Sequence, residues 1–194
     1  MKTLKLKLTG IRPLLMHNGR LADPTDPHTK ALKDQTKIKT KTDEVFETIA
    51  KLEWEGGLYW SEESGPFIPG DNIERCIQLG AQKNKDGKKV QAAVFCAEQE
   101  IPIQYDGPRE VKKMWEDTRF RLTKGVGVNG NRVMRTRPMI PTGWAATVQL
   151  EYDETVIEER SLVSAAVQAG ALVGIGDWRP KFGRFTVEIV ENGK

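Results

Sequence analysis

Cysteine and histidine are scarce in this chain of 194 residues, which contains two of each. Cys76 and Cys96 form no Cys-x-x-Cys pair, so the sequence predicts neither a disulfide framework nor a zinc site. A catalytic triad built on serine or cysteine needs a histidine base, and the chain offers only His17 and His28 for this role. The sequence signals no cofactor, and we expect none.

A leader pattern and long apolar runs are also missing. The segment Met1–Lys5 does not have the pattern of a signal peptide, and no stretch has the length and apolar character of a membrane span. Hydrophobic residues make up 38% of the chain and charged residues 29%. These values are typical of a soluble and rather polar protein, so we expect one cytoplasmic domain with no membrane partner.

Acidic residues are absent between Asp117 and Glu151, although the net charge of the chain is only +3. Acidic residues instead crowd into 151–159. This separation predicts a basic face and an acidic face. The alternative is an ordinary solvent-exposed surface that binds no ligand, which is what runs of charged residues most often form. Like charges without a carboxylate repel one another unless an anion is present. The cations of the interval are candidate nucleic-acid ligands: Arg119, Arg121, Lys124, Arg132, Arg135 and Arg137.

Hydrophobic periodicity predicts six core elements in the order βαββαβ. Asp71 is expected to cap the first helix, Gly170 to end the second, and residues 90–97 are ambiguous between helix and strand. The order predicts an α+β fold of the ferredoxin-like, RNA-recognition type. The predicted elements are strands at 4–9, 101–105, 144–152 and 184–190, with helices at 71–83 and 161–170.

The first of two excursions from this order covers residues 11–70. It contains a polar loop, from Asn18 to about Thr40, that we expect to be mobile. A helix capped by Thr42 is expected to follow and to run to about Trp54, because its apolar residues share one face.

The second excursion covers residues 107–143 and is expected to be a β-hairpin. Two basic arms flank Asn129-Gly130, and Asn-Gly is the strongest short signal for a hairpin turn. Gly125-x-Gly127-x-x-Gly130 also matches the dinucleotide-binding fingerprint. We interpret it as a flexible tip, because no helix follows that could hold a pyrophosphate at its N-terminus.

A glycine-rich loop joins the last predicted helix to the last strand. Its glycines let the backbone approach a ligand, its cations suit phosphates, and its aromatic residues suit stacking on bases. The alternative is an ordinary turn whose aromatic residues pack onto the core, as we expect for Trp54, Trp60, Trp115 and Trp144. We favour contact with single-stranded RNA, or alternatively single-stranded DNA. The candidate residues are Gly174, Gly176, Trp178, Arg179, Lys181, Phe182 and Arg184.

Few residues could support catalysis. His17 or His28 could act as the general base of a metal-independent ribonuclease, and Asp23 or Asp26 could position a hydrolytic metal ion or water. Loop histidines are usually inert, and Asp-Pro pairs are usually turn residues. We therefore predict no catalytic residue and no metal site, and keep an endoribonuclease as the alternative.

Short motifs resemble those of the RAMP superfamily, the RNA-binding proteins of CRISPR systems. Phe67–Ile73 is similar to that superfamily's IPGSSLKG segment, and Gly174–Arg184 is similar to its glycine-rich loop. Arg137–Gly143, which precedes the third predicted strand, also fits. At the helix start Asp71, Asn72 and Glu74 depart from the pattern of two serines and a lysine. Glu74 has the wrong charge for a phosphate contact, although Arg75 could compensate.

In layout the chain is similar to the Cas seven-type backbone subunit. This resemblance implies a single palm, a β-hairpin thumb at 107–143, a finger or lid at 11–70, and subunits stacked head to tail along RNA. It therefore implies a non-catalytic RNA-binding protein that self-assembles, within a CRISPR complex or as a stand-alone phage or mobile-element relative. A protein that oligomerises through its basic hairpin without nucleic acid is a further alternative, with the acidic segment 151–159 as the hairpin's partner.

Overall fold

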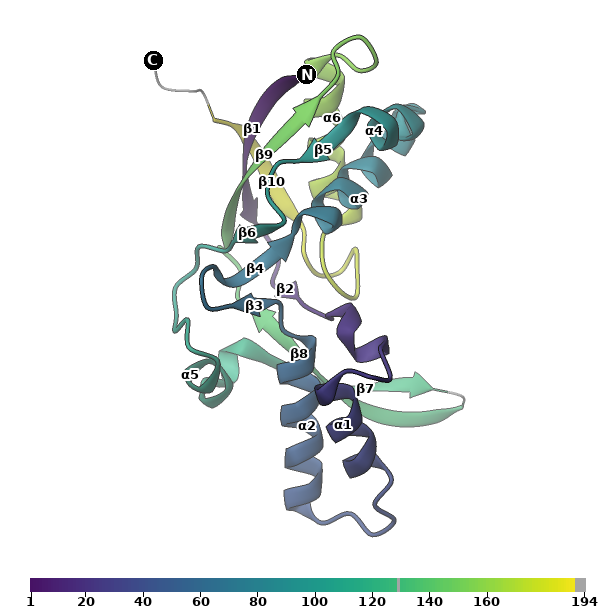
Figure 1. Cartoon of the computed structure of the whole chain (residues 1–194), viewed down its shortest axis with the longest axis vertical. Coiled ribbons are helices and arrows are strands. Elements are labelled where there is room, and N and C mark those ends of the chain that lie inside the picture. Colours follow the sequence, from purple (N-terminus) through teal and green to yellow (C-terminus); the bar gives the residue numbers. More distant parts are fainter. Residues whose placement is uncertain (129, 191–194) are drawn as a thin grey trace. The chain divides into compact units, whose positions relative to one another are not determined.

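The structure is a computed structural model that describes residues 1–128 and 130–190. The protein is α+β, with six α-helices and antiparallel sheets in the described part (Figure 1), which confirms the predicted class. Asn129, half of the predicted hairpin turn, lies outside the described residues. None of the helices in these two ranges is both long enough and apolar enough to cross a membrane.

The chain folds into two compact units, each assembled from separated segments. Unit 1 comprises Met1–Leu14, Trp60–Asp106 and Pro141–Lys194. Unit 2 comprises Leu15–Tyr59 and Gly107–Ile140. Both segments of unit 2 fall inside the two excursions that the sequence predicts, at 11–70 and 107–143.

A four-stranded antiparallel sheet with the strand order β10-β1-β9-β5 lies at the centre of unit 1 (Figure 1). Leu4 and Leu6 are buried on the same sheet face as Leu150 and Val148, their respective partners on the adjacent strand, as period-two alternation requires. The strands are β1 (Lys2–Gly10), β5 (Val94–Cys96), β9 (Ala145–Tyr152) and β10 (Phe185–Ile189).

Two helices cover one face of this sheet (Figure 1): α3 (Gly70–Ala81) and α6 (Glu159–Gln168). They pack closely at Gly80, where a Cβ would collide with the carbonyl oxygen of Ala165. The short helix α4 (Gly87–Ala93) lies between α3 and β5 in the chain. The resulting chain order of sheet strands and packed helices is β1, α3, β5, β9, α6, β10.

The predicted strand at 101–105 is wrong as a member of this sheet. Residues 94–96 take that place as β5, while β6 (Glu100–Pro102) is an edge strand of a second sheet with the order β3-β4-β6. Pro102 has no N–H to donate, which suits an edge strand better than a longer internal one. The other two strands of the second sheet are β3 (Trp60–Ser61) and β4 (Gly65–Pro69).

Both predicted caps of the unit 1 helices are wrong. Helix α3 begins at Gly70 after Pro69, so Asp71 lies in the first turn instead of at the cap. Helix α6 ends at Gln168, and the chain continues through Gly170 as a π-helical turn, Ala169–Val173, which is followed by Gly174 with a φ of 75°. Gly170 is a glycine because the carbonyl group of Phe185 leaves no room there for a Cβ.

Unit 2 contains the predicted hairpin, formed by β7 (Arg121–Val128) and β8 (Asn131–Ile140) in a sheet with the order β2-β8-β7. The strand β2 spans Leu14–Leu15. Helix α2 (Asp43–Gly57) follows Thr42, which is the predicted cap, and packs against β8. Helix α5 (Val111–Glu116) precedes the hairpin. The 3-10 turn η3 (Thr118–Phe120) leads into it, and the buried Trp54 donates from Nε1 to the carbonyl oxygen of Phe120 at 2.8 Å.

The polar loop expected at 18–40 is instead structured over most of its length. It contains the 3-10 turn η1 (Gly19–Ala22) and helix α1 (Pro27–Thr36). Asp26 caps α1 by accepting from the backbone N–H of His28 at 2.8 Å, and Pro27 occupies the first helical position, which proline favours. The hydrophobic pattern missed this helix because none of its residues is buried.

Candidate nucleic-acid interface

The glycine-rich loop of unit 1 is built on three glycines in left-handed backbone conformations. The φ angles are 75° at Gly174, 85° at Gly176 and 71° at Gly183. The two halves of the loop lie against each other, since Ile175 donates its N–H to the carbonyl oxygen of Gly183 at 2.9 Å. A Cβ at Gly183 would collide with the Ile175 carbonyl group. The shape of the loop therefore requires these glycines.

Backbone hydrogen bonds tie this loop to the end of β1 and to α3. Gly183 donates to the carbonyl oxygen of Pro13 at 2.8 Å, and Arg12 donates to that of Arg184 at 3.2 Å. The thiol of Cys76 donates to the carbonyl oxygen of Gly174 at 3.2 Å. Burial raises the pKa of Cys76 to about 12, and Arg179 opposes this rise. The thiol therefore stays protonated at neutral pH and remains a donor.

One face of the loop forms a hollow of about 480 Å³ that we call the cationic hollow. Its lining contains three cations, Arg12, Lys181 and Arg184, and none of the described residues around it is acidic. Nε of Arg184 is buried and has no hydrogen-bond partner within residues 1–128 and 130–190. Leaving a buried N–H unpaired costs about 1–3 kcal/mol, but this atom is enclosed by protein, so the guanidinium group has to turn toward the hollow before an anionic oxygen can reach it.

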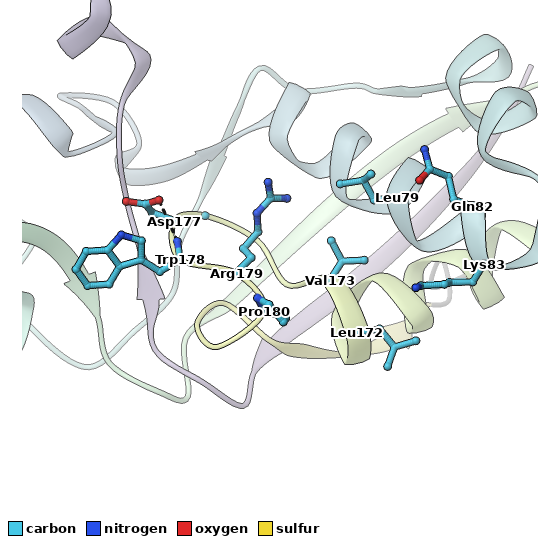
Figure 2. Close-up of a pocket in the computed structure, with 10 residues that line it drawn as sticks. Leu79, Gln82, Lys83, Leu172, Val173, Asp177, Trp178, Arg179 and Pro180 are labelled. Atoms are coloured by element: carbon cyan, nitrogen blue, oxygen red, sulfur yellow. Dashed lines mark hydrogen bonds between the residues drawn. The ribbon is translucent and has the colours of Figure 1, made fainter. Parts of the chain in front are cut away.

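A second hollow, of about 670 Å³, lies between the loop and the C-terminal end of α3 (Figure 2); we call it the loop pocket. It is lined by Leu79, Gln82, Lys83, Leu172, Val173, Gly176, Asp177, Trp178, Arg179 and Pro180. Trp178 is half-buried, so part of its side chain packs against the protein. Its ring lies 6.2 Å from that of Phe182, at an interplanar angle of 60°. The two aromatic residues therefore form a pair.

The hairpin cations of unit 2 have partners that the sequence did not indicate. Arg119 pairs with Asp117 at 2.8 Å, and Arg121 lies over the ring of Trp115, 4.4 Å from its centroid. Arg135 pairs with the buried carboxylate of Glu53. The inference that these cations lack a carboxylate is therefore wrong, because residues outside the interval supply two.

Strand register divides the hairpin cations between the two faces of the sheet. Lys124 lies opposite Arg135, and Arg137 is two residues further along the same strand, so these three share one face. Arg121 and Arg132 lie on the other face. The side chains of Lys124 and Arg132 are exposed and make no hydrogen bond or ion pair with any described residue. These two cations are the ones most available to a phosphate.

The four weak catalytic candidates lie in unit 2, and both aspartates have structural roles. Asp23 accepts from the N–H and the hydroxyl group of Thr25, at 2.8 and 2.7 Å. Asp26 caps α1 and pairs with Arg20 at 2.9 Å. These hydrogen bonds hold the pKa of both carboxyl groups below the ordinary value. Their oxygens are thus engaged in holding local turns.

The two histidines lie in different environments of unit 2. His28 lies half-buried on α1, and His17 is exposed, with its carbonyl oxygen accepting from the hydroxyl group of Tyr59 at 3.4 Å. Over the described ranges, the structure brings together no group of three or more His, Cys, Asp or Glu side chains that could hold a metal ion.

Arg12, Leu79, Gln82 and Lys83 are residues of the site that sequence reasoning missed. Arg12 follows a predicted strand, and its pairing with the loop depends on strand β10 lying next to β1. The only available signal was the adjacent Pro13, which ends the strand pattern. Glu74, the residue with the wrong charge for phosphate, accepts from the N–H of Cys96 at 2.7 Å.

No protein-family model matches this chain, and no curated protein matches it significantly.

Proposed function

We propose that the protein is a non-catalytic, single-stranded RNA-binding protein of the RAMP type. Unit 1 is then its ferredoxin-like palm and the hairpin its thumb. The strand order β10-β1-β9-β5, with α3 and α6 in the intervening connections, supports this assignment. Because one fold can carry many functions, the argument for RNA comes from the site.

The cationic hollow is the observation that carries the proposal. Three cations, Arg12, Lys181 and Arg184, line a space without an acidic lining residue, which is the environment that a phosphate oxygen neutralises. Phe182 lines the same hollow and offers an aromatic surface beside it. Adjacent cations and aromatic rings are the usual means of holding a single strand without reading its sequence.

The hairpin supplies a second, independent set of phosphate ligands, Lys124 and Arg132. In the proposed assembly each subunit adds its own hairpin and hollow to one strand, and a head-to-tail interface gives an open helix. Single-stranded DNA carries the same phosphates, and only contacts to the 2′-hydroxyl group would distinguish RNA from it.

Salt-dependent binding of a labelled single-stranded RNA of about 20 nucleotides tests the proposal. For three phosphate contacts in the hollow and two from Lys124 and Arg132 of the hairpin, log K should fall with log salt at a slope of roughly −3.5. The double variant Arg12→Ala/Lys181→Ala should bind about tenfold more weakly and lose about 1.4 from the magnitude of the slope. A competing DNA strand of the same sequence shows the preference for RNA.

The matched control is Lys7→Ala/Lys88→Ala, which removes two exposed lysines of unit 1 that do not line the hollow. Its salt slope should differ from the wild-type slope by less than about 0.7, the contribution of one phosphate contact. Equal losses in the two double variants would mean that only net charge matters, and absence of binding at low salt would refute the proposed function.

A further inference from the structure

We propose that the loop pocket binds a nucleobase, so that one base of the bound strand leaves the stack and enters unit 1. This inference rests on the proposed RNA-binding function and adds a base-specific contact to it. The cationic hollow, by comparison, holds mainly the sugar-phosphate backbone and offers a base only the ring of Phe182.

The pocket has an apolar wall of a size that suits a flat ring. Leu79, Leu172, Val173 and Pro180 form this wall, and 52% of Leu172 is exposed. Figure 2 shows Leu79 and Val173 between the side chains of Arg179 and Lys83. The depression of about 670 Å³ is wide enough for a nucleotide and largely open to solvent, so it covers one face of a flat ring. Covering this wall with a base would remove apolar surface from water.

The polar side chains of the pocket suit the edge and the phosphate of a nucleotide. Gln82, Lys83 and Arg179 are exposed, and in the part of the chain that the structure describes their side chains make no hydrogen bond or ion pair. An amide such as that of Gln82 both donates and accepts, so it can pair with the edge of a base. Lys83 and Arg179 can contact the phosphate groups on either side.

Charge distinguishes this pocket from the cationic hollow. Asp177 lines the pocket together with Lys83 and Arg179, so its formal charge is lower than that of the hollow with its three cations. A carboxylate in the lining disfavours a bare phosphate but accepts hydrogen bonds from the amino group of a base. The neutral, flat part of a nucleotide therefore fits here, and the phosphate fits the hollow.

The two sites are adjacent along the loop and share Pro180. Arg179 precedes this proline and belongs to the pocket, whereas Lys181 follows it and belongs to the hollow. A strand with a phosphate in the hollow can therefore place a neighbouring base in the pocket. Single-strand recognition commonly uses bases that are splayed out of the stack in this way.

The experiment uses the 194-residue chain and compares two strands of equal length: oligouridylate and an abasic ribose-phosphate oligomer. Wild type should bind oligouridylate about tenfold more tightly than the abasic strand. Leu172→Ser, which removes part of the apolar wall, should lose most of this preference and keep its affinity for the abasic strand. Gln82→Ala should change the ranking among oligouridylate, oligoadenylate and oligocytidylate.

Val167→Ser is the matched control, because Val167 is an apolar residue of α6 that is 47% exposed and does not line the pocket. It should keep the full preference for bases. A strand with a single 2-aminopurine gives a second measurement: its fluorescence should rise when the wild-type protein unstacks the base, and should rise less with Leu172→Ser.

Each outcome separates the two proposals. Equal binding of both strands by the wild-type protein overturns the base pocket and leaves the RNA-binding function standing. A base preference that Leu172→Ser does not reduce places the base elsewhere and also overturns the pocket. If neither strand binds, the RNA-binding function fails, and the base pocket fails with it.

Discussion

Glu53 is buried in unit 2, with 3% of its surface exposed, although carboxylates are rarely buried unless they are paired. It accepts from the guanidinium group of Arg135 and, at 2.9 Å, from the backbone N–H of Thr136. One side chain of α2 thereby satisfies a cation and a backbone donor of β8. This contact joins α2 to the hairpin. It also explains how a carboxylate can be buried inside unit 2.

Replacing Glu53 should destabilise the protein more than replacing any surface carboxylate of the same helix. Glu53→Ala leaves Arg135 and the Thr136 N–H without their acceptor, and we expect a loss of about 2–4 kcal/mol in the free energy of unfolding. Arg135 is partly exposed, which keeps the loss below that of a fully buried pair. Urea unfolding followed by circular dichroism measures it.

Glu55→Ala is the control for this prediction. Glu55 belongs to the same helix and pairs at 3.9 Å with Lys51, which is exposed, while Glu55 is half-buried. Glu55→Ala should lower the free energy of unfolding by less than about 1 kcal/mol. Similar losses in the two variants would show that Glu53 has no special role in joining α2 to β8.

The thiol of Cys76 makes stability depend on pH at the alkaline end. Burial raises the pKa of this group from 9.0 to about 12 in the folded protein. Above about pH 9 the unfolded chain releases the thiol proton and the folded protein does not, so stability should fall as the pH rises toward 12. The slope due to this thiol is at most about 1.4 kcal/mol per pH unit.

Urea midpoints between pH 8 and pH 11 check this dependence. Cys76→Ala should flatten the alkaline decline relative to the wild-type protein, and the two curves should run parallel below pH 8. Burial also raises the pKa of Cys96, to about 11, so Cys96→Ala should flatten the decline as well. An unchanged slope in both variants would contradict the burial argument.

At the scale of elements, the glycine-rich loop is held by backbone geometry that only glycine tolerates. Gly183→Ala places a Cβ against the carbonyl group of Ile175 at a φ of 71°, so we expect a loss of at least about 2 kcal/mol in unfolding free energy. Thermal unfolding measures this loss. Gly19→Ala should shift the midpoint little, since a Cβ there has no atom within 4 Å.

The hairpin should use its unpaired cations, and not its paired ones, to hold RNA. Lys124→Ala and Arg132→Ala should each reduce the magnitude of the salt slope by about 0.7, the value for one single-strand phosphate contact. Arg119→Ala should reduce it less, because Asp117 already neutralises Arg119 at 2.8 Å. The slopes come from binding isotherms at several salt concentrations. A larger effect for Arg119→Ala would reverse this assignment.

Elements with a strong local pattern were predictable, and short or polar ones were not. The alternation of Leu4, Leu6 and Leu8 with polar residues predicts β1 correctly, because period two in apolar residues is a local property. Strand β5 has only three residues, too few for a pattern. Helix α1 has none of its residues buried, so only Asp26 and Pro27 at its start could have signalled it.

At the scale of the whole molecule, the proposed head-to-tail assembly should grow with the length of the RNA. Strands of 20, 40 and 80 nucleotides should yield complexes whose protein content rises in proportion to length, since an open helix has no closed symmetry to stop it. Light scattering after size exclusion measures the masses. A fixed number of subunits on all three strands would indicate a closed oligomer, and an unchanged mass after nuclease treatment would indicate assembly without nucleic acid.

Sequence alone determined the α+β class, the hairpin and the composition of the glycine-rich loop, because each depends on residues close together in the chain. Tertiary structure decided which distant residues meet. Strand pairing brings Arg12 to Arg184, and helix packing brings Glu53 to Arg135, 82 residues away. A charge pattern along the sequence does not reveal such partners. The energy of an ion pair depends on the distance between the charges and on their burial, and the fold sets both.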